Sequence, residues 1–414
     1  MKDPTTTPVL RRQIYKDALL LHVGRSFQVL VNALTFILLA RVLGATEFGR
    51  FSTVVAILSP SLAIADLGLG QLAMKAVAQD NAREVALVRR SIPIVYVACS
   101  GMLAVDCILA ALLLRHSWSA VAAAAMLGVS YLHMQAQVNI QRGLWLGALS
   151  FPRAIIIEVI TASIRLLGLA VVLAFNWTSL IGVSAGIALS GVFTLAVVQS
   201  CLAYQFSGFE PRFSWREVAG EGAPFPLTAL SWNSFVELPK LILAGVSTSA
   251  AVGFFSAAYR VFSIALVPLQ AALNAFTPRL FAAATKRGGV PLLRALGENL
   301  LLAASLAGVL MLGAPLLPIV LGAQYAPATS VLPVLALSLP AQALVSVAGD
   351  WLGGSGRQRH RLFVTGATLL IGIPVNMVAA QQKGPVGSAA AYSAMTAVLA
   401  LASILLASRV PTSE

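Results

Sequence analysis

The chain has very few charged residues. Only 10% of its 414 residues are charged, compared with about 25% in soluble domains. Residues 166–209 and residues 299–349 contain no charge at all, and uncharged runs of about 18 residues or more are typical of membrane spans. Because 58% of the residues are hydrophobic, a soluble enzyme, a secreted disulfide scaffold and a disordered tail are excluded. The sequence predicts a polytopic membrane protein.

Residues that bind metals or cofactors are also scarce. The four histidines are scattered and show no metal-ligand spacing, and the three cysteines lie in apolar runs, where a thiol behaves as a small hydrophobe. There is no phosphate-binding loop to indicate ATP hydrolysis. Gly68, Gly70 and Ala73 fit a dinucleotide fingerprint, but they follow an apolar helix and not a strand. We therefore expect no metal and no cofactor.

The net charge of +13 lies mostly in the loops between apolar runs. This distribution orients a membrane protein and differs from the basic face that binds nucleic acid, so no nucleic-acid partner is expected. In the predicted topology twenty basic residues fall on one side, and Arg41, Arg50, Arg115 and Lys383 fall on the other. The bias places both termini in the cytoplasm, and a bacterial inner membrane is the natural setting.

Charges, prolines and glycines divide the chain into twelve hydrophobic segments, each too long for a barrel strand. The first of them is long, contains Arg25 and has no small-residue cleavage site, so we interpret it as a span and not as a signal peptide. No loop is long enough to hold a catalytic domain, which makes passage through the bundle the expected activity. The segments are approximately 18–42, 48–74, 92–114, 118–141, 153–175, 179–204, 223–246, 252–278, 295–321, 326–352, 361–381 and 385–408.

A short internal repeat indicates how the helices are organised. A shift of 204 residues superimposes Ala40, Val42, Gly49, Phe51 and Ser52 on Ala244, Val246, Gly253, Phe255 and Ser256. Transporters are commonly built from such duplicated halves. The predicted fold is an all-α polytopic membrane protein with twelve transmembrane helices in two six-helix pseudo-symmetric halves around a central cavity. The halves are residues 1–204 and 222–414, joined by a cytoplasmic loop at 205–221.

Polar residues inside the predicted spans follow helical spacing, so each set lies on one helix face. The stripes occur in the first two helices of each half, which predicts a hydrated cavity lined by these four helices. They comprise Arg25, Gln28, Asn32 and Thr35; Ser52, Ser59 and Asp66; Asn233, Glu237 and Lys240; and Ser256, Arg260, Ser263, Gln270, Asn274 and Thr277.

An ionisable side chain in mid-membrane costs several kcal/mol and is therefore a functional candidate. The predicted substrate-binding residues are Arg25, Gln28, Asn32, Lys240, Arg260, Gln270 and Asn274, with Asp66 and Glu237 as coupling or gating residues. The alternative is that the stripes are interhelical contacts and that Glu237 and Lys240 neutralise each other. Second-tier candidates, for which a structural role is favoured, are Asp106, Glu158, Arg165, Gln342, Ser346 and Asp350. His133, Gln137 and Gln141 are interpreted as a packing network.

The segment from Ala40 to Ala78 resembles the polysaccharide and oligosaccharidyl-lipid flippases of the multidrug/oligosaccharidyl-lipid/polysaccharide exporter superfamily. The similar elements are the AR-LG turn at 40–44, the aromatic-glycine pair Phe48 and Gly49, and the run from Asp66 to Leu69. Family members often carry tyrosine in place of Phe48. A layout of twelve helices, compared with fourteen in lipid II flippases, favours exporters of O-antigen, capsule or exopolysaccharide units.

The resemblance implies a flippase that moves an undecaprenyl-diphosphate-linked oligosaccharide to the outer leaflet. The partners would be this polyprenyl-diphosphate-linked oligosaccharide, membrane lipid and other polysaccharide-assembly proteins. Basic residues facing the cavity receive the head group in this family, and we carry that role to Arg25, Lys240 and Arg260. Three alternatives stay open: a cation-coupled drug or metabolite antiporter of the same fold, a membrane-embedded sugar polymerase or ligase, and a non-transporting scaffold.

Overall fold

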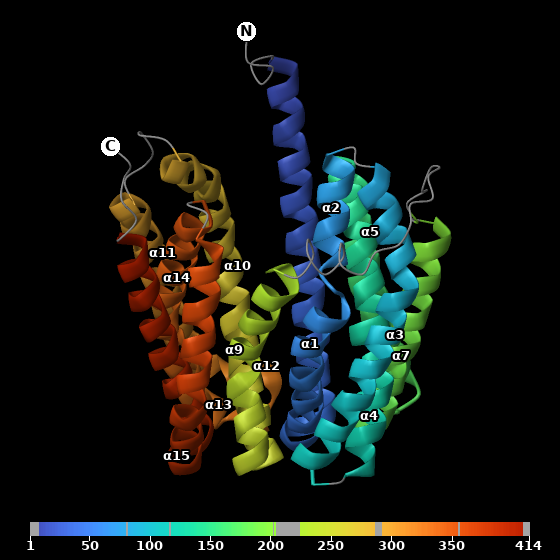
Figure 1. Cartoon of the computed structure of the whole chain (residues 1–414). Coiled ribbons are helices and arrows are strands. Elements are labelled where there is room, and N and C mark those ends of the chain that lie inside the picture. Colours follow the sequence, from blue (N-terminus) through green and yellow to red (C-terminus); the bar gives the residue numbers. More distant parts are fainter. Residues whose placement is uncertain are drawn as a thin grey trace. The chain divides into compact units, whose positions relative to one another are not determined.

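The structure, a computed structural model, describes residues 8–79, 82–115, 117–201, 203, 224–285, 292–354 and 357–408. In these ranges the chain is helical apart from short turns and contains no β-strand (Figure 1). Eight of the helices described are long and apolar enough to cross a membrane. The predicted all-α class is therefore confirmed.

The helices form two compact units, which are described separately. The first unit consists of Met1–Leu38 and Ile57–Leu230, and the second of Leu39–Ala56 and Ser231–Glu414. The chain passes from one unit to the other inside α1 (Pro8–Ala65), twice, and inside α9 (Pro224–Val246). A segment from the N-terminal part of the chain therefore belongs, by its contacts, to the second unit.

Helix α1 is two helices joined at a break. Gly44 interrupts it with φ 71° and ψ 169°, which are not helical angles, and glycine adopts a positive φ without the steric penalty of a Cβ atom. The span Ser26–Ala65 has 40 residues, whereas about 20 residues suffice to cross a bilayer. The break therefore falls where the sequence places the turn between the first two predicted spans.

Over residues 69–201, the described part of the first unit continues through six α-helices and one π-helical turn, which joins α4 and α5 without a loop. Two of the helices, α5 and α6, end in the same hydrogen-bonded motif. After α6 the left-handed Asn176 and the following Trp177 donate to the carbonyls of Leu173 and Val172, which is the Schellman arrangement. The elements are α2 (Leu69–Ala78), α3 (Ala82–Leu113), α4 (Trp118–Gly128), η2 (Val129–Met134), α5 (Gln135–Gly147), α6 (Phe151–Ala174) and α7 (Leu180–Cys201).

The second unit has an aromatic core. Tyr392 is fully buried, and its ring packs against Phe235 and Tyr259 at centroid distances of 5.7 and 5.9 Å. Gln342 donates a hydrogen bond to the Tyr392 hydroxyl at 2.8 Å, which satisfies the polar end of this ring. The elements besides α9 are α10 (Ser249–Thr285), α11 (Leu292–Gly313), η3 (Ala314–Leu316), α12 (Leu317–Leu321), η4 (Ala323–Tyr325), α13 (Ala328–Ala336), α14 (Ser338–Gly354) and α15 (Gln358–Ser408).

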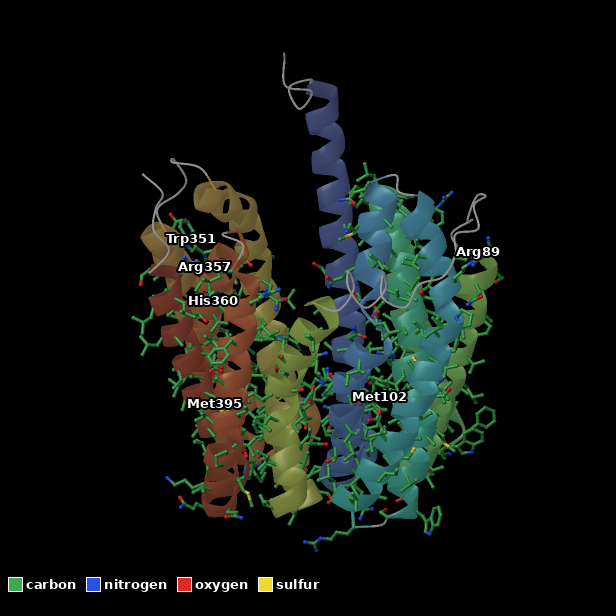
Figure 2. The ribbon with its side chains drawn as sticks, viewed as in Figure 1. Arg89, Met102, Trp351, Arg357, His360 and Met395 are labelled. Atoms are coloured by element: carbon green, nitrogen blue, oxygen red, sulfur yellow. The ribbon has the colours of Figure 1, made fainter. Side chains whose placement is uncertain are left out.

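Helix α15 turns back on itself at Lys383 and Gly384, whose backbone angles are not helical. Ser388 Oγ donates to Asn376 Oδ1 at 3.1 Å across the turn. Further along, the Met395 side chain, labelled in Figure 2, occupies the space that a Cβ atom on Gly372 would fill. The span of 50 residues within α15 is thus two helices packed side by side.

Within the second unit, the turn at Gly44 is hydrogen-bonded to α12 and to the segment that follows it. Arg41 donates to the carbonyls of Val320 and Ile319 at 2.8 and 2.9 Å, and Tyr325 donates its hydroxyl to the carbonyl of Ala40 at 2.9 Å. Burial raises the pKa of Tyr325 above its usual range, so the phenol stays a donor. These bonds satisfy carbonyls that helix ends leave without partners.

Two finer features of the predicted fold stay predictions. The count of twelve spans in two pseudo-symmetric halves around a central cavity is not established by the eight apolar helices alone. The division into 1–204 and 222–414 is likewise untested, and the connecting segment 205–221 lies outside the described residues.

Candidate functional site

The turn between α1 and α2 holds an acidic side chain at the start of a helix. After α1 ends at Ala65, Leu67 and Gly68 adopt left-handed backbone angles, with φ of 54° and 69°. A leucine held in this region carries strain of about 1–3 kcal/mol, and such strain clusters at functional sites. The turn places Asp66 three residues before α2 begins at Leu69, near the positive end of the helix dipole, which stabilises a carboxylate.

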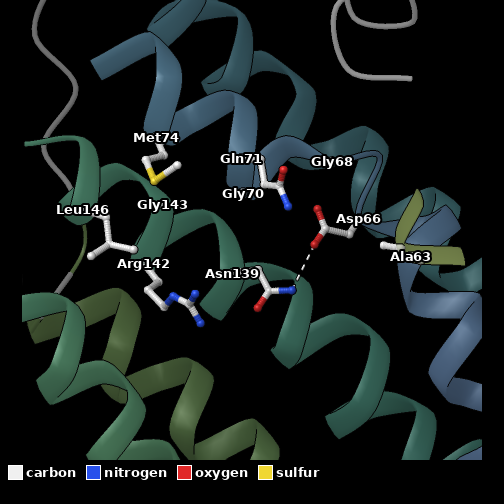
Figure 3. A pocket seen from close by; sticks show the side chains of 11 residues that line it. Ala63, Asp66, Gly68, Gly70, Gln71, Met74, Asn139, Arg142, Gly143 and Leu146 are labelled. Carbon is white, nitrogen blue, oxygen red and sulfur yellow. Dashed lines mark hydrogen bonds between the residues drawn. The ribbon is translucent and has the colours of Figure 1, made fainter. Parts of the chain in front are cut away.

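Helices α2 and α5 pack closely through glycines, and this brings an amide to Asp66. A Cβ atom on Gly143 would overlap the carbonyl oxygen of Gly70, so the two backbones approach as only small residues allow. Asn139 Nδ2 consequently donates to Asp66 Oδ2 at 2.9 Å (Figure 3). Asn139 is oriented in turn by Gln135, whose Nε2 donates to Asn139 Oδ1 at 3.1 Å.

A cavity of about 470 Å³ opens beside Asp66 within the first unit. Its size lies in the usual range for small-molecule sites, about 300–1,000 Å³. Figure 3 shows that its wall combines charged or amide groups with apolar side chains: Asp66, Gln71, Asn139 and Arg142 with Met74 and Leu146. An apolar helix bundle with such a cavity can receive a polar group that water would otherwise solvate.

Arg142 also borders a second, smaller cavity of about 60 Å³. Its Nη1 donates to Glu158 Oε1 at 2.7 Å, and the two side chains are 46% and 19% exposed. A pair with this exposure leaves guanidinium donors free for another anion, because arginine carries five of them. Gln28 and Asn32 line the same small cavity. The polar stripe of α1 therefore meets charged residues of α5 and α6.

Arg165 supplies a second cation to the small cavity. Its guanidinium carbon lies 5.5 Å from the ring centroid of Tyr131, and its Nε is buried without a hydrogen-bond partner among the described residues. Because an uncompensated cation is costly in an apolar bundle, this nitrogen marks a place for water or an anionic group.

In the second unit the predicted coupling residue Glu237 is neutralised. Lys240 Nζ donates to Glu237 Oε2 at 2.5 Å, and the two residues are only 5% and 8% exposed. The ammonium group also lies 4.8 Å from the ring centroid of Tyr259, a cation–π distance. Glu237 and Lys240 thus form the ion pair that was the structural alternative for this stripe. The charge of Lys240 is balanced by Glu237.

The remaining predicted site residues do not gather in one place that the structure describes. Arg260 and Gln270 are exposed on α10. The side chains of Arg25 and Asn274 are outside those described. Only Gln28 and Asn32 are found together, in the small cavity, while Asp66 lies on the larger one.

Sequence reasoning missed Arg142 and Asn139. Arg142 was counted as a loop residue because the predicted span ended at 141, but α5 continues to Gly147. The available signal was the spacing of Gln135, Asn139 and Arg142 by four and three residues, which is the same helical stripe that was recognised elsewhere.

Long apolar helices enclosing a polar cavity define an integral membrane transporter. The sequence model of the family described as polysaccharide biosynthesis protein matches residues 14–283. The chain belongs to this family, and its long apolar helices make it a multi-pass membrane protein. No curated protein sequence matches the chain significantly.

Solved structures share the fold at low sequence identity. An inward-facing multidrug resistance MATE family transporter of the MOP superfamily matches with a TM-score of 0.80 at 17% identity. The match covers 94% of this chain and 96% of that transporter. The lipid II flippase MurJ, in an inward closed conformation, matches with a TM-score of 0.74 at 13% identity, over 94% of this chain and 87% of the flippase. A MOP superfamily transporter from Pyrococcus furiosus has a TM-score of 0.68 at 17% identity, covering 95% and 94%.

Proposed function

We propose that this protein is a flippase for polyprenyl-diphosphate-linked oligosaccharide repeat units and serves surface polysaccharide biosynthesis. Its family is that of polysaccharide biosynthesis proteins, and a protein of the same fold is a lipid II flippase. The head group would cross through the polar interior while the polyprenyl chain stays in the bilayer, so no covalent chemistry is required.

The observation that carries this proposal is the position of Arg142. Its guanidinium borders the cavity of about 470 Å³ and shares its charge with Glu158. A planar guanidinium binds phosphate oxygens through paired hydrogen bonds, and the amides of Gln71 and Asn139 on the same wall suit sugar hydroxyls. A diphosphate would compete with Glu158 for Arg142, so binding would be reversible.

The predicted site residues keep their proposed roles in this scheme, with one reassignment. Because Glu237 neutralises Lys240, we give the diphosphate contact to Arg142 together with Arg25 and Arg260. The proposed contacts to sugar hydroxyls are Gln28, Asn32, Gln270 and Asn274, and Asp66 is the proposed gating carboxylate. Alternating access of the halves 1–204 and 222–414 would move the substrate, driven by membrane potential or by a coupled proton or sodium ion.

The setting follows from the same proposal. A bacterial inner membrane with both termini cytoplasmic fits the excess of basic residues on one side of the predicted topology. Lipid-linked repeat units are then loaded from the cytoplasmic leaflet, and other polysaccharide-assembly proteins would receive them on the far side.

One rival function is favoured by a specific observation. A multidrug resistance transporter has the same fold with a TM-score of 0.80, and Asp66 in the larger cavity could attract a cationic drug. The two functions differ in the sign of the charge on the transported group, since Arg142 would repel a cation and Asp66 would repel a diphosphate.

The test is head-group accessibility in proteoliposomes that contain a polyprenyl-diphosphate disaccharide, detected with a fluorescent lectin. The wild type should expose the sugar on the opposite leaflet, and Arg142→Ala, Arg25→Ala and Arg260→Ala should each slow this movement. Arg359→Ala is the matched control because this cation is exposed at the start of α15 and lines neither cavity.

Each outcome has a defined meaning. Movement that is lost in the cavity variants but kept in the control supports both function and site. If none of the three variants affects the movement, the flippase function stands and the proposed cationic site is rejected. A wild type that moves no lipid diphosphate but exchanges an organic cation for protons would establish the rival antiporter.

A further inference from the structure

Asp106 is a buried carboxyl group that neither cavity uses. It lies on α3 and is 0% exposed. Its Oδ1 is 2.6 Å from the hydroxyl oxygen of Ser61 on α1. Its Oδ2 is buried and has no hydrogen-bond partner among the described residues. A hydroxyl is therefore the whole polar environment that the described structure offers this carboxyl.

Three other carboxyl groups of the described residues have a cation or an amide as a partner. Asp66 has Asn139, although Asp66 Oδ1 is also buried without a hydrogen-bond partner in the described part of the chain, Glu158 has Arg142, and Glu237 has Lys240. Buried charges are normally paired, because a lone ion in an apolar interior costs several kcal/mol. Asp106 is the exception among these four, and the neutral acid is the form that its surroundings accommodate.

Among the side chains that the structure describes, no charged group contacts Asp106 from the helices around it. Residues 51–65 of α1 contain no ionisable group, and Cys107 is its titratable neighbour on α3. The elements packed against α3 are α2, α4 and η2. Their ionisable residues are Lys75 on α2, which has a partner of its own, and Tyr131 and His133 on η2, which lie against Arg165 and Ser100.

The Ser61 hydroxyl has two acceptors but one proton. Besides Asp106 Oδ1, it lies 3.3 Å from the backbone carbonyl of Ile57. If Asp106 is ionised, the hydroxyl proton must point to the carboxylate. If Asp106 is protonated, the acid can donate to Ser61 Oγ, and Ser61 can donate onward to Ile57. Binding one proton thus turns the hydroxyl from the side chain toward the helix backbone.

The Ser61 hydroxyl lies next to a position where α1 lacks a backbone hydrogen bond. Pro60 has no N–H, so the carbonyl of Ala56 lacks its helical partner. A serine that bonds to a carbonyl one turn earlier bends a helix further. The division between the two units falls between Ala56 and Ile57. The switchable bond and the missing bond therefore coincide with the place where the chain passes from one unit to the other.

We propose that Asp106 is a proton-binding site, and that its protonation is passed through Ser61 to the bend of α1 at Pro60. The ligand is a proton, exchanged with water when the transporter changes conformation. The proton's release leaves a carboxylate that must recruit water or a new donor to Oδ2. Coupling of this event to transport rests on the proposed flippase function, whereas the proton site itself does not.

The proton site is tested first by infrared spectroscopy of the purified protein in lipid. A protonated carboxyl gives a C=O stretching band that shifts in deuterium oxide. We expect this band in the wild type at mildly acidic pH, its loss in Asp106→Asn, and its retention in Asp66→Asn, the matched carboxyl control. A band with altered frequency in Ser61→Ala would show that the hydroxyl contacts the acid. A spectrum unchanged by Asp106→Asn would overturn the assignment.

The coupling is tested in proteoliposomes with a fluorescent polyprenyl-diphosphate disaccharide and an imposed pH gradient. The wild type should be accelerated by a gradient of one polarity, and Asp106→Asn should move the lipid at a rate independent of it. Gradient dependence retained in Asp106→Asn overturns the coupling. If the wild type moves no lipid, the proposed function fails, and the infrared result still decides the proton site.

Discussion

Gly49 and Gly253 make the same contact in reciprocal form. A Cβ atom on Gly49 would overlap the carbonyl oxygen of Ser249, and a Cβ atom on Gly253 would overlap the carbonyl oxygen of Ala45. The shift of 204 residues that pairs the two glycines also pairs Ala45 with Ser249. Equivalent positions of the internal repeat therefore contact each other within the second unit.

Replacing either glycine should destabilise this helix crossing. In Gly49→Ala or Gly253→Ala the added methyl group meets backbone, which cannot move aside as a side chain can. We expect a loss of about 1–3 kcal/mol, the usual penalty for overpacking, measured as a lower midpoint of thermal unfolding in detergent. Gly308→Ala on α11 is the control, since nothing lies near its Cβ position. Equal midpoints for all three variants would contradict the close crossing.

The hydroxyl of Tyr325 should stabilise the turn at Gly44. Tyr325→Phe leaves the carbonyl of Ala40 buried without its donor, and an unsatisfied buried group costs about 1–3 kcal/mol. Chemical denaturation in detergent would measure the loss. Tyr131→Phe is the matched control, because the Tyr131 hydroxyl has no partner among the described residues. A similar loss in both variants would argue against a stabilising hydrogen bond from Tyr325 to Ala40.

The ion pair between Glu237 and Lys240 should behave as a buried pair in a double-mutant cycle. Glu237→Gln alone strands a buried ammonium and should destabilise the protein by about 3–5 kcal/mol, whereas Glu237→Leu with Lys240→Met should recover most of the loss. The half-exposed pair of Arg50 and Glu47 should contribute only about 0.2–1 kcal/mol. Thermal unfolding reports the coupling energy.

The same double variant separates stability from transport. Because we assign Lys240 a structural role, a stable Glu237→Leu, Lys240→Met protein should still move the lipid diphosphate. A folded double variant without transport would return Lys240 to the substrate-binding residues, as the sequence alone suggested.

Arg142 should require its shape as well as its charge. Arg142→Lys keeps the cation but loses the planar fork that pairs with two phosphate oxygens. Because a hydrogen bond to a charged group contributes about 1.5–3 kcal/mol, we expect the initial rate of head-group movement to fall by roughly tenfold or more. Glu158→Gln frees the guanidinium and should strengthen substrate binding. Wild-type rates in Arg142→Lys would exclude direct contact with the diphosphate.

The arrangement of polar residues along one helix can be predicted because helical spacing is local. The spacing puts Gln28 and Asn32 on one face of their helix, and both line the small cavity. The partners of that face could not be predicted, because Glu158 and Arg165 are more than a hundred residues away in the chain. Periodicity says which residues share a face, but it is silent about which helix that face meets.

The sequence by itself determined the class of protein and its helical character. Long uncharged runs have no stable alternative to helices in a bilayer, since every backbone group must be bonded within its own segment. Only the tertiary structure decided which polar groups are neutralised. Asp66 meets Asn139 because two glycines let α2 and α5 approach closely, while Asp106 meets only a hydroxyl. Those outcomes depend on helix crossings, which spacing along one helix does not encode.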